Sequence, residues 1–224
     1  MTLQIIIIAL IVLIAIIILA KKLSKHKSLF PLMPFKYNFN LRRDTFKETL
    51  QLLEKRNGKM ILETGTSRDG LKNTAGDGAA TIVFGKWAKI HKGEVISVDI
   101  SNDSIKGAQQ GLHEENLNDV VTLHLSDSVA FLEKFNRPID LLYLDSYDYS
   151  LHDTEIQVKS QEHHLKEFVA AEKNLHKNSI ILIDDCDLPG GGKGKIVVDH
   201  LLKKDWVIIT NAYQILLVKK ESIS

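Results

Sequence analysis

The sequence predicts an α/β protein with a mostly parallel sheet, preceded by one apolar N-terminal helix. Three observations support this prediction. Hydrophobic runs of strand length alternate with segments of helical periodicity through most of the chain, which is typical of βαβ units. Five of these runs end at acidic residues. The last two runs are separated only by Asn211, Ala212 and Tyr213, a gap too short for a crossover helix, which predicts an antiparallel hairpin.

The composition is that of one globular domain with an additional N-terminal segment. The chain has 224 residues, a formal net charge of +1 and one cysteine. One globular domain of roughly 180 to 200 residues remains once the N-terminus is set aside. The charge balance lacks the basic excess of nucleic-acid-binding proteins, so no nucleic-acid partner is expected. A single cysteine fits a reducing compartment. We expect Cys186 to be a small buried residue rather than a nucleophile, because no histidine follows it in a clear partner position.

Residues 3–20 form an apolar run interrupted only by Gln4. A helix of that length, rising about 1.5 Å per residue, covers most of an about 30 Å hydrocarbon core, so the run is predicted to be a single-pass transmembrane anchor. A cleavable secretory signal is disfavoured because no basic side chain precedes the run. Four lysines follow it within residues 21–27, and the positive-inside tendency then places the remaining chain in the cytoplasm. An uncleaved helix that packs on a partner is the alternative.

Residues 21–56 are expected to form a basic juxtamembrane linker and a leading helix. The segment 28–40 contains two prolines and little periodicity, which predicts a linker or a strap laid on the domain surface. Residues 41–56 have apolar side chains at helical spacing, which predicts an amphipathic helix. The main domain is then expected over residues 57–220.

The strands and helices of this domain follow from the alternation of hydrophobic patterns. Strands are expected at 60–63, 95–99, 120–125, 139–144, 179–183, 206–210 and 214–219. Helices are expected at 79–90, 104–115, 129–134, 154–176 and 195–203. Such alternation favours a parallel sheet with helices on both faces.

The acidic residues that end the hydrophobic runs predict a ligand site. In an open parallel sheet, ligands bind outside the carboxyl ends of the strands. The acids at these ends are Glu63, Asp99, Asp127, Asp145, Asp184 and Asp185. Their order along the chain indicates a nucleotide-type ligand.

The stretches ETGTSRDG, VISVD, LSDS, DLLYLDSYDY and IILIDD together resemble the class I S-adenosylmethionine-dependent methyltransferases over residues 57–220. The resemblance implies a Rossmann-like, seven-stranded sheet that is parallel apart from one antiparallel strand in a C-terminal hairpin. It also implies S-adenosylmethionine as cofactor. In its strand-end acids the chain is most similar to the metal-dependent O-methyltransferases of the catechol and caffeoyl-CoA type and to the cephalosporin hydroxylase-like relatives.

The resemblance implies cofactor roles for the first three strand ends. Glycine lets the backbone approach the ligand in the first motif, and the hydroxyl and amide groups after it would meet the amino-acid part of the cofactor. A polar insertion, LKNTAGDG, departs from the family's glycine spacing, so Asp77 and Gly78 at the end of the insertion are expected to complete the loop. The expected cofactor-binding residues are Glu63, Gly65, Thr66, Ser67, Gly70, Asp77, Gly78, Asp99, Asp127 and Ser128.

Two of these assignments have a structural alternative. Asp99 matches the acid that hydrogen-bonds both ribose hydroxyls, a role for a charged acceptor, but it could instead cap the following SNDS segment. Asp127, with Ser128, matches the position near the adenine amino group, but it could instead cap the helix VAFLEKF.

Asp145, Asp184 and Asp185 are predicted to bind a metal. Carboxylates on neighbouring strand ends repel one another unless a cation or proton is shared, and oxygen ligands suit a hard divalent ion. Mg²⁺ is the candidate. In the metal-dependent relatives the ion orients two substrate oxygens and lowers the pKa of the hydroxyl to be methylated. The alternative is that one acid of the pair Asp184 and Asp185 caps the following loop while the other faces water.

The expected catalytic residues are Asp145, Asp148 and His164. Asp148 stands where catechol-type enzymes carry a lysine, which puts a lysine base in doubt. Histidines 163 and 164 are neighbours on a helix, about 100° apart, so at most one is expected to face the crevice, and a solvated helix face is the alternative. The loop LPGGGKGK is not a P-loop; it could bind a phosphate or carboxylate of the substrate or act as a lid.

The sequence as a whole predicts a membrane-anchored methyltransferase. The methyl group would pass from S-adenosylmethionine to an oxygen, or less readily a nitrogen, of a small-molecule or lipid-linked acceptor. A nicotinamide-dependent oxidoreductase would share Asp99 but should have a tighter G-x-G-x-x-G loop. A non-catalytic scaffold with the same fold would have nearly the same sequence. The oligomeric state is not predicted.

Overall fold

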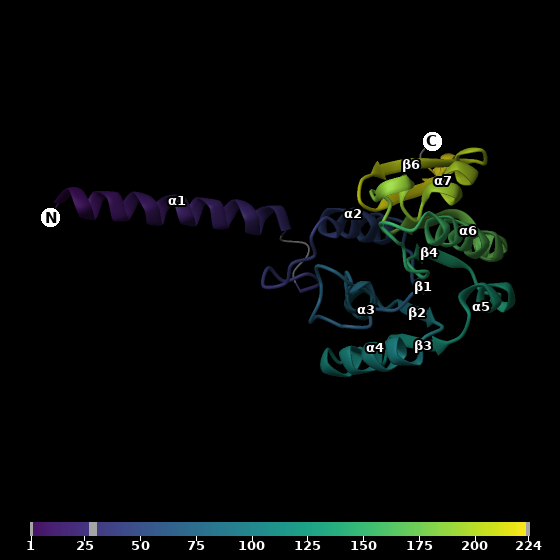
Figure 1. Ribbon diagram of the computed structural model, residues 1–224. Coiled ribbons are helices and arrows are strands. Elements are labelled where there is room, and N and C mark those ends of the chain that lie inside the picture. Colours follow the sequence, from purple (N-terminus) through teal and green to yellow (C-terminus); the bar gives the residue numbers. More distant parts are fainter. Residues whose placement is uncertain (1, 27–30, 223–224) are drawn as a thin grey trace. The chain divides into compact units, whose positions relative to one another are not determined.

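A computed structural model describes residues 2–26 and 31–222 (Figure 1). The chain divides into two compact units, Met1–Pro34 and Phe35–Ser224. The first contains helix α1 (Thr2–His26). Its stretch Gln4–Lys21 has a mean hydropathy of 3.0 and no buried residues, and it is apolar and long enough to cross a membrane.

The second unit is built on a seven-stranded sheet. Its strands are β1 (Met60–Thr64), β2 (Glu94–Asp99), β3 (Val121–Leu125), β4 (Ile139–Leu144), β5 (Leu175–Ile183), β6 (Trp206–Asn211) and β7 (Ile215–Lys219). The strand order is β3-β2-β1-β4-β5-β7-β6. β7 pairs antiparallel with both β5 and β6, while the remaining pairs are parallel. The predicted fold class, including the C-terminal hairpin, is confirmed.

Six helices accompany the sheet. They are α2 (Arg42–Lys55), α3 (Ala80–His91), α4 (Asn102–Glu114), α5 (Ser128–Lys134), α6 (Thr154–Ala171) and α7 (Lys195–Leu202). The described residues also contain the short 3₁₀ helices η2 (Glu172–Asn174), η3 (Pro189–Gly191) and η4 (Lys220–Ser222). Figure 1 shows α3 on one side of the central strands and α5 and α6 on the other.

Alternate residues of the central strands pack against these two helical layers. Leu62 and Leu142 belong to the apolar cluster that α5, α6 and α7 complete. Tyr143, one residue further along, instead meets Phe46 of α2 and Phe84 of α3, with ring centroids 6.0 and 5.2 Å away. β1 is therefore buried along its whole length, as expected of a parallel strand covered on both faces.

Two segments differ from the sequence prediction. The helix expected at 154–176 ends at Ala171, and β5 begins at Leu175, because Leu175 pairs with Ile139 of β4 before the register shifts. In the expected surface strap, Phe39 is fully buried, while residues 28–30 of the strap lie outside the described residues. Cys186 is buried, as predicted.

The helix α2 is fastened to the sheet by Phe46. Its ring is completely buried and makes an edge-to-face contact with Phe84, with centroids 5.5 Å apart. Phe46→Ala should lower the free energy of unfolding by about 3 to 5 kcal/mol, because it leaves a cavity in the core. Chemical denaturation followed by fluorescence of the buried Trp87 and Trp206 measures the change. The control, Ile90→Ala at a side chain 52% exposed, should change stability by less than about 1 kcal/mol.

Candidate active site

Two adjoining cavities lie at the carboxyl ends of the central strands. The larger has a volume of about 600 Å³. It is lined by Gly65, Arg68, Val98, Asp99, Ile100, Ser101, Ser104, Asp127, Ser128, Ser146, Tyr147, Asp148 and His163. The smaller, of about 150 Å³, is almost entirely polar, and its walls include Arg42, Glu63, Thr66, Ser67, Asp77, Asp145, Asp185 and Lys193. Five residues, among them Gly65 and Asp99, line both cavities, so one ligand can extend from one into the other.

Gly65 makes the turn that opens both cavities. Its φ is +80°, and a Cβ at this position would lie 2.4 Å from the carbonyl oxygen of Asp145. The Gly65 amide donates to the carbonyl of Val98, 2.9 Å away. The turn therefore passes between the ends of β2 and β4 with room for glycine alone.

Thr81, in the first turn of α3, organises the loop after β1. Its hydroxyl accepts a hydrogen bond from the Ser67 amide at 2.8 Å and lies 3.2 Å from the Thr66 hydroxyl. It donates to Glu63 Oε2 at 2.8 Å. A threonine within an apolar helix gives no signal in the sequence, so this residue was missed. Thr81 holds three of the predicted cofactor-binding residues in place.

Glu63 is fully buried at the end of β1. Burial raises the pKa of its carboxyl group to about 8, although the hydroxyl of Thr81 opposes this, and the charges of Asp77 and Asp99 add to it. The side chain is therefore largely protonated at neutral pH when no cation faces it. A ligand with a positive charge in the polar cavity would favour the carboxylate.

Asp99 presents its carboxylate to the cavities. One oxygen accepts from the Thr66 amide at 3.1 Å, and the other accepts from the Ser101 amide at 2.7 Å. The residue that caps α4 is Ser101, whose hydroxyl accepts from the Ser104 amide, so Asp99 is not the helix cap. A carboxylate has about four acceptor positions, which leaves Asp99 capacity for two further donors.

Asp127 is a helix cap, one of the two roles that the sequence left open, while its role near an adenine amino group stays a prediction. Its Oδ1 caps α5 by accepting from the Ala130 amide at 2.8 Å, and the residue also lines the larger cavity. Beside it, the Ser128 hydroxyl lies 3.1 Å from Nε2 of His163. The same nitrogen lies 3.3 Å from the buried Glu167 carboxylate.

Of the two adjacent histidines, His163 faces the larger cavity. Burial alone would lower the pKa of His163, but the hydrogen bond and charge of Glu167 raise it. His164 is completely buried, its Nδ1 lies 2.7 Å from the Ser160 carbonyl, and burial lowers its pKa to about 4. His164 lines neither cavity, so the geometry favours His163 over the predicted His164 as the histidine that meets a ligand.

Of the remaining predicted residues in the loop after β1, one lines a cavity and two pack behind it. Asp77 lines the polar cavity, and Arg68 pairs with it at 3.6 Å and with the exposed Asp148 at 3.1 Å. Gly78 packs against the side chain of Arg42, and Gly70 packs against the backbone of Gly111. These two glycines shape the loop without lining either cavity.

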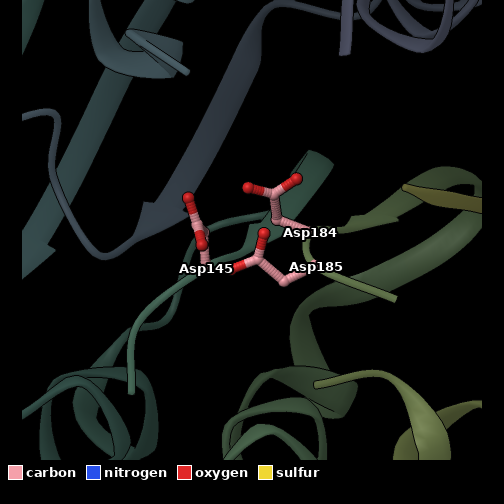
Figure 2. Close-up of side chains that lie close together, drawn as sticks. All are labelled: Asp145, Asp184 and Asp185. Atoms are coloured by element: carbon pink, nitrogen blue, oxygen red, sulfur yellow. The ribbon is translucent and has the colours of Figure 1, made fainter. Parts of the chain in front are cut away.

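Asp145, Asp184 and Asp185 come together where β4 and β5 end (Figure 2), with ligand oxygens within 4.8 Å of one another. Successive residues of a strand normally point to opposite faces. Asp185 has a φ of 52°, a left-handed conformation that turns the chain after Asp184. Asp184 is completely buried. The predicted three-carboxylate cluster is therefore present in the structure.

Two cations from distant segments occupy this cluster. The Nε of Arg42, at the start of α2, donates to both oxygens of Asp184 at 3.0 and 2.8 Å, and its Nη2 lies 3.1 Å from Asp185 Oδ1. The ammonium of Lys193 lies 2.6 Å from Asp145 Oδ1 and 3.1 Å from Asp185 Oδ2. Burial alone would lower the pKa of Lys193, but the three carboxylates raise it, so the ammonium stays charged.

Sequence reasoning missed Arg42 and anticipated Lys193 only as part of an anion-binding loop. The anionic groups that this loop binds are the carboxylates of the protein's own cluster. Two tyrosines complete it: the hydroxyl of Tyr143 donates to Asp145 Oδ2 at 3.3 Å, and that of Tyr213 donates to Asp185 Oδ1. Each carboxylate oxygen of the cluster thus has a donor from the protein.

This arrangement does not fit the predicted Mg²⁺. A hard divalent ion needs several free carboxylate or carbonyl oxygens around one point. That point, between Asp145 and Asp185, is taken by the ammonium of Lys193, whose side chain is 4% exposed. No step of a reaction is therefore assigned to a metal.

Comparison with known proteins identifies a family to which the chain is similar. A family model described as a methyltransferase domain matches residues 75–186, half of the 224-residue chain. A search of curated protein sequences gave no match.

The solved structures that share the fold include the following three. A putative caffeoyl-CoA O-methyltransferase from Staphylococcus aureus is 15% identical, with a TM-score of 0.58 over 89% of this chain and 91% of that one. An O-methyltransferase from Bacillus cereus, in complex with SAH, is 16% identical, with a TM-score of 0.56 over 89% of each chain. The O-methyltransferase TomG from Streptomyces achromogenes, in complex with SAM, is 16% identical, with a TM-score of 0.56 over 90% and 88%. Together with the matching family model, the fold and the strand-end cavities show that the chain belongs to the methyltransferase domain family and has the class I fold.

Proposed function

We propose that this protein transfers a methyl group from S-adenosylmethionine to an oxygen of a small-molecule or membrane-associated acceptor. The observation that carries the proposal is Asp99. It ends β2 on the wall of a cavity of about 600 Å³, and its carboxylate retains acceptor capacity toward that cavity. Cavities of this size commonly hold small ligands. A nucleoside with two ribose hydroxyls supplies the donors that Asp99 lacks.

The two cavities suit the two halves of the cofactor. The adenosine part fits the larger cavity, where Val98 and Ile100 add apolar surface and Ser128 adds a polar group. The amino-acid part fits the polar cavity, where Glu63 would face the ammonium. The sulfonium would then lie where the cavities join, close to the acids that end β4.

Methyl transfer at this point is an in-line displacement. A bond forms between the acceptor oxygen and the methyl carbon, the carbon–sulfur bond breaks, and the sulfonium becomes a neutral thioether. The acceptor's proton must pass to a base. Asp148 is the better placed of the two predicted carboxylates, because it is exposed and lines both cavities, with its Oδ1 paired to Arg68. Both oxygens of Asp145, by contrast, accept hydrogen bonds from Lys193 and Tyr143. Positioning supplies much of the rate in such a reaction.

Oxygen is proposed as the acceptor atom because the three structures compared above are named as O-methyltransferases. The apolar helix α1 supports a membrane-anchored enzyme whose catalytic unit lies in the cytoplasm, since lysines follow the apolar stretch. An anchored enzyme would meet lipid-linked or membrane-generated acceptors at high local concentration. A metal is not part of this proposal.

Asp99→Ala should weaken S-adenosylhomocysteine binding by the full chain at least about tenfold, because two charge-assisted hydrogen bonds are lost. Calorimetric titration of the detergent-solubilised protein measures this. Asp103→Ala, at an aspartate whose side chain is 95% exposed, is the matched control and should bind like the wild type. Folded wild-type protein that binds neither the cofactor nor its product would exclude the proposal. Binding without turnover across an acceptor screen would favour a scaffold.

Glu63→Gln should alter the pH dependence of both stability and binding. The folded-state pKa of about 8 exceeds the ordinary 4.5, so the native state holds one more proton between these values and stability falls as pH rises through this range. The variant should lose this slope.

Binding of the cofactor's ammonium to wild-type protein at pH 7 should release a proton, and the variant should release none. Calorimetry in buffers with different ionisation enthalpies measures the release. Glu162→Gln, at an exposed position of α6, is the control. Proton release that is equal in all three proteins would contradict the assignment of Glu63 to the ammonium.

The anchor can be tested within the full chain. Leu10→Lys together with Ile14→Lys should move the protein from carbonate-washed membranes to the soluble fraction, because each lysine costs about 2.5 to 3.5 kcal/mol at the centre of a spanning helix. The control pair, Leu10→Val and Ile14→Val, should stay in the membrane. A wild-type protein that carbonate extracts completely would show that α1 is not a membrane span.

A further inference from the structure

We infer that Lys193 is the built-in counter-cation of the three-carboxylate cluster, and that it occupies the place a divalent metal would need. The inference deepens the proposed function and rests on it, because it assigns the cation at the same site. It makes the site independent of added metal. It also removes the requirement that the acceptor present two adjacent oxygens.

The position of Lys193 is set by two carboxylates at once. Its ammonium bridges Asp145 at 2.6 Å and Asp185 at 3.1 Å, two residues from different strand ends. A metal ion joining the same strand ends would have to lie at the same point. Lys193 is also one of the residues that line the polar cavity.

The loop that carries Lys193 is fastened rather than free. The Lys193 amide donates to the Asp185 carbonyl at 3.0 Å. The side-chain amide of Gln161, on α6, donates to the carbonyls of Gly190 and Gly192 at 3.1 and 3.0 Å. A Cβ at Gly192 would lie 1.9 Å from the Asp185 carbonyl, so the loop lies directly on the strand end. Moving this loop away from the strand end would break these contacts.

The charge of the cluster also favours lysine over a metal. Three carboxylates face two cations, Arg42 and Lys193, so one negative charge remains. A bound sulfonium carries one positive charge, which that residual charge attracts. A divalent ion added beside both side chains would reverse the sign of the cluster and repel the sulfonium.

The acceptor class follows from this. A metal in such a site would orient two oxygens of the substrate together. A lysine ammonium is a point charge with three rotatable donors, and it can meet a single hydroxyl or phenolate oxygen. The acceptor therefore need not present two adjacent oxygens, and compounds with one hydroxyl should be accepted as readily as catechol-like ones.

Manganese binding tests the inference directly. The full chain in detergent, without cofactor, is titrated with Mn²⁺, and free Mn²⁺ is counted by electron paramagnetic resonance. Wild-type protein should bind no Mn²⁺ at the cluster up to about 1 mM. Lys193→Met keeps the buried aliphatic stem but removes the charge. This variant should therefore gain a site that binds Mn²⁺ at least about tenfold more tightly than the wild-type protein does. Asp145→Asn in the Lys193→Met background should abolish the gained site.

Lys195→Met is the matched control, because Lys195 lies on the same segment but is exposed and pairs with Asp199; it should gain no site. Circular dichroism establishes that each variant is folded. Tight Mn²⁺ binding by wild-type protein that Asp145→Asn removes would overturn the inference, and this arm needs no lysine variant. A folded Lys193→Met protein that gains no site would also overturn it. Binding of S-adenosylhomocysteine, measured separately, reports on the proposed function alone.

Discussion

The constraint on which the rest of the structure depends is the gathering of three carboxylates at the ends of two neighbouring strands, with Asp184 buried and Asp145 and Asp185 half-buried. An unpaired buried carboxylate is costly, and removing one partner of a buried pair costs about 3 to 5 kcal/mol. Arg42 begins α2 and Lys193 lies in the loop after β5, so pairing the carboxylates with cations requires both segments to dock on the sheet. The charges thus fasten the helix that leads into the domain and close the edge of the site.

The apolar core and the charged cluster are joined through Tyr143. Its ring packs between Phe46 and Phe84, and its hydroxyl donates to Asp145 while accepting from the Gln214 side chain at 3.3 Å. Aromatic packing therefore fixes the position of the Tyr143 hydroxyl that donates to the cluster. A change in the aromatic core should shift this hydroxyl, and a change in the cluster should disturb the packing of the ring. Arg42 adds a second link, since its guanidinium also lies over the ring of Tyr213.

The sequence was sufficient for the sheet because buried parallel strands and their helices have distinct periodicities, and because Asn211, Ala212 and Tyr213 leave no room for a crossover. It was sufficient for the strand-end acids because strand ends meet at one edge. The sequence did not predict the cations of the cluster. Arg42 and Asp184 are 142 residues apart, and a basic residue at the start of a helix is normally expected to face solvent. The end of α6 was missed because its boundary is set by the pairing of Leu175 with Ile139, a contact between distant segments.

Hydrogen-bond saturation separates the strand-end acids into two kinds, although their sequence positions are equivalent. The oxygens of Asp99 each accept one backbone amide and keep capacity that faces a cavity. The oxygens of Asp145, Asp184 and Asp185 are engaged by arginine, lysine and tyrosine side chains. An acid of the first kind can bind a ligand without rearrangement, whereas one of the second kind would first have to release a charged partner. The same acidic pattern can therefore serve a metal in one protein and an internal ion pair in another, and the position of the cations decides which.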